Sequence, residues 1–134
     1  AGLLEISNPS ELFLMERENN VSGTAVFAGT QGSRPLLIEI QALTCPTTMP
    51  TPRRSVVGWD VNRLSMIIAV LGVRFGLNLS SHEVYLSVAG GLKITDPAAD
   101  LAVVAALISA ASNKSLPAKS IFFGEVGLSG EVRK

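Results

Sequence analysis

Segment 90–100 combines features that could present a nucleophile to a cleft. It reads Gly-Gly-Leu-Lys-Ile-Thr-Asp-Pro-Ala-Ala-Asp, so that a glycine pair breaks a strand and Asp96 and Pro97 begin a helix. A helix N-terminus stabilises developing negative charge, as an acyl-transfer reaction requires. Ala98, at the start of this helix, has no hydroxyl and cannot attack a carbonyl. The segment therefore predicts the backbone geometry of an active site without a catalytic residue.

The other residues that could do chemistry are isolated. Cys45 and His82 are the only cysteine and the only histidine, so neither a disulfide framework nor a zinc site with ordinary ligand spacing is expected. We interpret His82 as a loop or surface residue and Cys45 as a small packed side chain. Segment 29–34 has glycines but lacks the lysine and helix of a phosphate-binding loop, and we interpret it as a hairpin loop. The sequence predicts neither a metal site nor ATP binding.

The elements that must position these residues follow from apolar spacing and turn residues. Segments 21–28 and 36–43 are strand-like and are expected to form an antiparallel pair around the loop 29–33. Segment 44–52, with three prolines and four threonines, is expected to be an extended loop. A short strand is expected at 84–89, and further strands at 121–123 and 126–132 with a turn at Gly124 and Gly127.

Two long helices are expected between these strands. Asp60 should cap the first, which Gly76 ends. Its predicted apolar face consists of Val61, Leu64, Ile67, Ile68, Leu71 and Phe75. Asp96 should cap the second, with Leu101, Val104, Ala105 and Ile108 on one face. A shorter helix near Asn8 is expected in a connector over 1–19. Residues 20–134 then form the main domain. Its strands and helices predict an α/β fold, an α+β sandwich.

Composition limits the functional classes. The 134 residues suit one domain, and their 16% charged residues fall below the roughly 25% of ordinary domains, which suggests that a partner covers some apolar surface. Basic and acidic residues number 11 each, so any nucleic-acid contact must be a local patch. No apolar run predicts a membrane helix, and we expect a cytoplasmic location. The start without methionine and the end after a strand-like run suggest a piece of a longer protein.

Segment 90–100 resembles the proteolytic domain of the Lon protease family, in which a Pro-Ser-Ala-Gly motif carries the nucleophilic serine of a Ser–Lys dyad. Aligned by its proline, the motif falls on 97–100, with Ala98 at the nucleophile position and Asp100 in place of glycine. Segment 124–132 is similar to the later Lon segment that leads toward the catalytic lysine, which would fall past Lys134. The resemblance implies a Lon proteolytic-domain-like fold, of the ribosomal protein S5 domain 2-like kind, without either member of the dyad.

The chain resembles the RadA (Sms) family of bacterial DNA repair proteins more closely. The resemblance rests on segments 8–14, 51–54, 58–64, 90–93 and 96–102, which read NPSELFL, TPRR, GWDVNRL, GGLK and DPAADLA. It implies a zinc finger and a RecA-like ATPase outside this chain, followed by the Lon-like domain. Zinc, ATP and magnesium are therefore expected in those other domains, with no cofactor in this chain.

The resemblance also implies a homo-hexameric ring that processes recombination intermediates by branch migration during DNA break repair. Its DNA would be single-stranded or branched, and the recombinase RecA is an implied partner, with no membrane. This domain would scaffold the ring and help to contact DNA. Our hypothesis is that Arg53, Arg54 and Lys93 face DNA, because arginine engages phosphate bidentately.

We expect Asp60, Asn62 and Arg63 to serve a subunit contact or to anchor a loop. Solvated arginines with local ion pairs remain an equal alternative for the basic residues. Two other functions stay open for the chain. One is a protein-interaction or oligomerisation module without DNA contact, and the other is a residual Lon-type serine peptidase with its nucleophile outside the motif.

Overall fold

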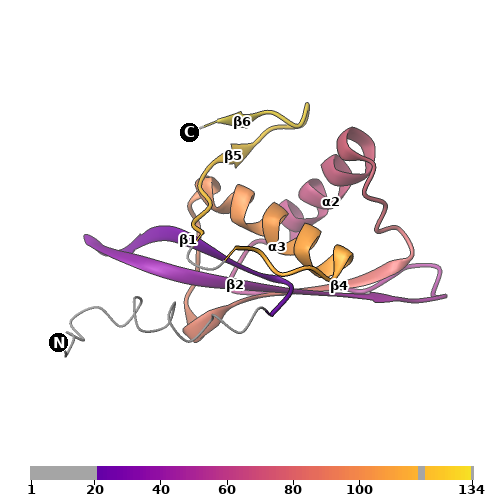
Figure 1. The fold of residues 1–134 in the computed structure, drawn as a ribbon, viewed down its shortest axis with the longest axis horizontal. Helices are drawn as coiled ribbons and strands as arrows, with labels where there is room; N and C mark the ends of the chain where they lie inside the picture. Colours follow the sequence, from indigo (N-terminus) through magenta and orange to yellow (C-terminus); the bar gives the residue numbers. More distant parts are fainter. Residues whose placement is uncertain (1–20, 118–119, 134) are drawn as a thin grey trace.

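A four-stranded mixed sheet forms one layer of the computed structural model, which describes residues 21–117 and 120–133, without the side chain of Gln31 (Figure 1). In spatial order the strands are β1 (Thr24–Gln31), β2 (Arg34–Pro46), β4 (His82–Val88) and β3 (Arg54–Val57). β2 pairs antiparallel with both β1 and β4, whereas β3 runs parallel to β4. The expected connector helix and Lys134 lie outside the described residues.

Two helices, α2 (Val61–Phe75) and α3 (Asp100–Ser112), cover one face of this sheet (Figure 1). α2 connects the parallel strands β3 and β4, as such a crossover requires. Short 3-10 turns, η1 (Ala89–Gly91) and η2 (Pro97–Ala99), lie between β4 and α3. The mixed sheet with two helices confirms the α+β prediction at that level. None of the described helices is long and apolar enough to cross a membrane.

The β1–β2 hairpin is longer than predicted. β1 continues to Gln31 and β2 begins at Arg34, so only Gly32 and Ser33 form the turn, and the expected loop 29–33 was too long. Gly32 has a φ of +65°, the left-handed backbone that such tight turns need. At its other end β2 runs through Pro46, which pairs with His82 of β4. The first residues of the predicted loop 44–52 are therefore strand.

The ends of α2 lie where the sequence places them, but its buried stripe is shorter. The Asp60 carboxylate accepts a hydrogen bond from the Asn62 amide at 2.9 Å, and Gly76 ends the helix with a φ of +74°. The buried side chains are Leu64, Ile67, Val70 and Leu71. Val61 is 44% exposed and Phe75 is 59% exposed, so the predicted stripe is wrong at both ends.

α3 is apolar on nearly every side, and this misled the prediction of its face. Ile108, assigned to the buried face, is 45% exposed. The residues that are buried are Asp100, Ala102, Val103, Ala105, Ala106, Leu107 and Ser109. In a helix this rich in alanine and valine, hydrophobic spacing does not single out one face. The predicted helix start at 97 is a 3-10 turn, and regular α-helix begins at Asp100.

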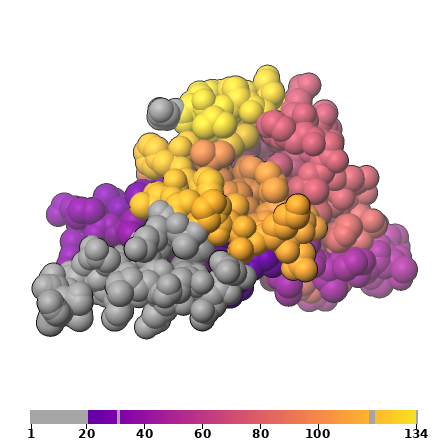
Figure 2. Space-filling model, viewed as in Figure 1, coloured from indigo at the N-terminus to yellow at the C-terminus, as the bar shows by residue number. Residues whose placement is uncertain are grey.

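The last part of the chain forms a small hairpin instead of the long strand predicted for 126–132. β5 (Glu125–Val126) pairs antiparallel with β6 (Val132–Arg133) around a turn in which the Gly130 amide donates to the Gly127 carbonyl at 2.9 Å. The predicted strand 121–123 is reduced to a single bridge between Phe122 and Phe27. Figure 2 shows the hairpin beside α2, where Arg74 Nε donates to the Leu128 carbonyl at 3.2 Å.

Candidate functional site

The start of α3 is held by hydrogen bonds that use the amides of its first turn. Asp96 accepts from the Ala98 amide at 2.9 Å through its carboxylate and from the Ala99 amide at 3.1 Å through its carbonyl. The Leu101 amide donates to the Gly124 carbonyl at 3.0 Å, and the Gly124 amide donates to the Ala98 carbonyl at 2.8 Å. An oxyanion would need free amides of this kind. Here these donors already have partners within the chain.

A buried carboxylate lies at the first residue of α3. Asp100 is fully buried, and its two carboxylate oxygens accept from Arg63 Nε at 2.6 Å and Arg63 Nη2 at 2.5 Å. The amide of Val126 donates to the same carboxylate at 2.9 Å. Glu125 Oε2 lies 3.6 Å from Arg63 Nη2. The ion pair therefore ties α2, α3 and β5 together.

The charge of Arg63 belongs to this pair. The hydrogen bond with Asp100 raises the pKa of the guanidinium above its ordinary value, against the opposing effect of burial. Sequence reasoning expected Arg63 to anchor a loop or contact a subunit, and it treated Asp100 only as a replacement for glycine. The role of Asp100 was missed. An acidic residue in the first turn of an otherwise apolar helix was the signal that could have revealed it.

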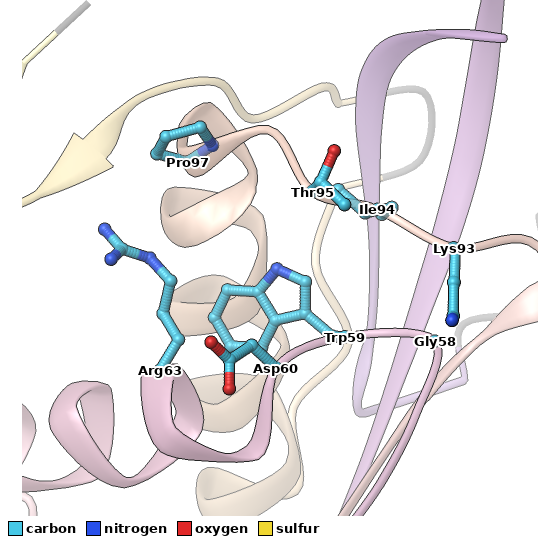
Figure 3. Close-up of a pocket in the computed structure, with 8 residues that line it drawn as sticks. All are labelled: Gly58, Trp59, Asp60, Arg63, Lys93, Ile94, Thr95 and Pro97. Carbon is cyan, nitrogen blue, oxygen red and sulfur yellow. The ribbon is translucent and has the colours of Figure 1, made fainter.

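A pocket of about 460 Å³ opens between the segment that leads into α2 and the loop that precedes η2 (Figure 3). Its lining residues are Gly58, Trp59, Asp60, Arg63, Lys93, Ile94, Thr95 and Pro97. The Ile94 amide donates to the Gly58 carbonyl at 2.9 Å, which fixes one wall to the other. Gly58 has a φ of +87°, and a Cβ there would lie 2.5 Å from the Leu92 carbonyl oxygen. The sequence therefore forms this close crossing only with glycine at position 58.

The three predicted DNA-facing residues do not form one cluster. Lys93 lies in the pocket beside Gly58, after the end of β3, whereas Arg53 precedes the start of that strand. The four residues of β3 separate the two positions by about 13 Å. Arg54 Nη2 donates to the Leu79 carbonyl at 3.1 Å, and Nη1 donates to the carbonyl of His82. Arg54 thus anchors the loop that enters β4, while Arg53 and Lys93 are exposed.

Asp60, Asn62 and Arg63 lie together at the start of α2, whereas Cys45 lies on β2. Asp60 and Arg63 line the pocket, whereas Asn62 is exposed in the first turn of α2 and contributes its amide to the cap. Cys45 is exposed, so its interpretation as a packed side chain is wrong. Because β2 extends through Pro46, Cys45 lies on the strand face opposite to Ile40 and Ala42.

His82 is the first residue of β4 and is half-buried, with a buried Nδ1 that lacks a hydrogen-bond partner. Within residues 21–117 and 120–133, no group of three or more histidine, cysteine or acidic side chains is placed to hold a metal ion.

Comparison with known proteins gives a consistent result along the whole chain. The chain is 71% identical over 134 residues to a protein named DNA repair protein RadA from Rickettsia bellii. It is 57% identical over 132 residues to the protein of that name from Brucella abortus, and 47% identical over 133 residues to that from Bacillus subtilis. These matches cover 98–100% of the chain, which spans about 30% of the length of the relatives. No protein-family model matches the chain.

Proposed function

Because this chain is a segment related throughout to the RadA family of DNA repair proteins, we propose that it is the non-proteolytic, Lon-like scaffold domain of a DNA-dependent ATPase. The parent protein would assemble as a homo-hexameric ring in the cytoplasm and process single-stranded or branched DNA by branch migration, together with RecA. ATP, magnesium and zinc would be held by domains outside this chain. The domain would support the ring and contribute to DNA contact.

The start of α3 is the observation that carries the scaffold role. Ala98 offers no hydroxyl, and the amides of Ala98, Ala99 and Leu101 are all hydrogen-bonded within the chain. Peptide hydrolysis by a serine dyad needs an activated nucleophile and free donors for the oxyanion. The buried Asp100–Arg63 pair joins this helix start to α2. These features favour a fixed support over a reactive centre.

A fluorophosphonate probe tests the non-proteolytic part of the proposal. The probe labels activated serines, so we expect no labelled residue within this chain when the full-length protein is treated and mapped by mass spectrometry. A serine labelled at a stoichiometric level, and protected by prior peptide substrate, would identify a residual peptidase and overturn the scaffold assignment.

Two exposed cations support DNA contact. Among the described residues, the side chains of Arg53 and Lys93 form no ion pair, so their charge is available to a phosphate. Arg54 and Arg63 are instead committed to carbonyl and carboxylate groups of the chain. The DNA proposal therefore rests on Arg53 and Lys93, with Arg54 positioning the loop between α2 and β4.

Salt-dependent binding tests this contact. In the full-length protein, Arg53→Gln and Lys93→Gln together should weaken binding to single-stranded DNA. They should also reduce the slope of log K against log salt by about 1.4, since each lost phosphate contact contributes about 0.7. Lys114→Gln is the matched control, because Lys114 is exposed beyond the end of α3. An unchanged affinity and slope in the double variant would eliminate the DNA contact.

Exposed apolar side chains favour a second candidate, an interaction module without DNA contact. Val73 is 76% exposed, Leu128 is 67% exposed and Leu43 is 61% exposed, and such side chains suit burial against another protein. Light scattering of the full-length protein together with DNA titration separates the two functions. A ring that forms but does not bind DNA would support this second candidate.

A further inference from the structure

We propose that the pocket between segments 58–60 and 93–97 holds one nucleotide unit of a single DNA strand, with the base against the ring of Trp59. This inference rests on the proposed DNA contact and assigns it a specific subsite. Figure 3 shows the Trp59 ring in the middle of the pocket, between Arg63 on one side and Lys93 on the other.

The indole ring supplies the surface for stacking. Trp59 is half-buried, packing against the core while also lining the pocket. Every base has a π-face, so an aromatic ring in a groove can bind single strands with little regard to sequence. Ile94, which is 6% exposed, adds an apolar side chain to the lining. A ring-shaped, partly apolar group such as a base is suited to this lining.

The distribution of charge favours a base within the pocket and a phosphate at its rim. The Arg63 guanidinium is balanced by buried Asp100, and Asp60 adds one carboxylate to the lining, so apart from Lys93 the pocket carries a net negative charge that disfavours a phosphate in its interior. That carboxylate could also accept from the exocyclic amino group of a base. Lys93 is exposed and without an ion pair among the described residues, which leaves its ammonium available to the adjoining phosphate.

The pocket is formed before any ligand arrives. The Ile94–Gly58 hydrogen bond of 2.9 Å and the left-handed backbone of Gly58 hold the two walls at a fixed separation. Binding would therefore order few additional groups, and a rigid site loses less affinity to conformational entropy. A volume of about 460 Å³ lies within the usual range of small-ligand sites.

Trp59 is the only tryptophan of the chain, and its fluorescence tests the inference directly. The full-length protein is titrated with a single-stranded oligonucleotide and with an abasic strand of equal length, and anisotropy of labelled DNA reports binding. The difference between the wild type and Trp59→Phe isolates the emission of Trp59. We expect the base-bearing strand to quench this emission and the abasic strand to leave it unchanged at equal occupancy.

Affinity of a variant provides a second measurement. Trp59→Leu keeps an apolar group against the core but removes the aromatic face, and it should weaken binding of the base-bearing strand by about 5- to 150-fold. Binding of the abasic strand should not change, whereas a general folding defect would weaken both strands. DNA binding with unchanged Trp59 emission and unaltered affinity in Trp59→Leu overturns this subsite alone. Absence of any DNA binding overturns the proposed function as well.

Discussion

Arg63→Ala should destabilise the fold more than any substitution of an exposed arginine. Among the residues that the structure describes, Arg63 is the only cation within 4 Å of the fully buried Asp100 carboxylate. Two hydrogen bonds, of 2.6 and 2.5 Å, are lost at once. Breaking a buried ion pair by removing one partner typically costs about 3–5 kcal/mol, since the remaining charge stays away from water. We therefore expect the free energy of unfolding to fall by about that amount.

The assay is urea unfolding of the chain, followed by fluorescence of Trp59. Arg74→Ala is the matched control, because Arg74 lies on the same helix but donates only to an exposed carbonyl at 3.2 Å; its loss should cost about 0.5 kcal/mol. The double variant Arg63→Ala/Asp100→Ala should lose less free energy of unfolding than the two single variants lose in sum. The difference should be about 0.5–3 kcal/mol. A loss below about 1 kcal/mol for Arg63→Ala, or strict additivity, would refute this reasoning.

Three further outcomes follow from individual contacts. Ser109→Ala should lower the free energy of unfolding by about 1–3 kcal/mol, because its buried hydroxyl accepts from the Gly23 amide at 2.7 Å; denaturant unfolding measures this. Gly58→Ala should cost at least about 1–3 kcal/mol in the same assay, since its φ is +87° and a Cβ would collide with a carbonyl. The hydrogen bond to Glu83 raises the pKa of Tyr85, the only tyrosine, so Glu83→Gln should lower the midpoint of its ultraviolet titration. This raised pKa contributes stability below about pH 10, which is lost as pH rises through the folded pKa.

The ends of helices and strands could be predicted from the sequence where few residue types fit the required backbone or cap. Asp60 and Gly76 bound α2 as expected, because an aspartate that accepts from the first amides and a glycine with positive φ have few substitutes at helix ends. Gly90 and Gly91 both adopt positive φ and end β4 as predicted. The α+β arrangement followed from the order of strands and helices.

Predictions failed where burial depends on residues distant in sequence. The exposure of Ile108 and the burial of Leu107 depend on how the sheet and α2 approach α3, and a helix that is apolar all round does not encode that direction. The Arg63–Asp100 pair joins positions 37 apart, so neither residue alone indicates the contact. The separation of Arg53 from Lys93 likewise requires knowing that they lie beyond opposite ends of β3.

The Ser109–Gly23 hydrogen bond bears on how the protein folds as it is made. It joins residues 86 positions apart, and the same helix packs on β1 and β2. A ribosome adding about 5–20 residues per second needs about 4–17 s to synthesise that interval. During this time the inner face of the β1–β2 hairpin, including Phe27 and Ile40, lacks the helix that covers it. Nascent chains that contain the β1–β2 hairpin but not yet α3 should therefore be the most prone to chaperone binding and aggregation. This exposure of the inner face ends once α3 leaves the exit tunnel.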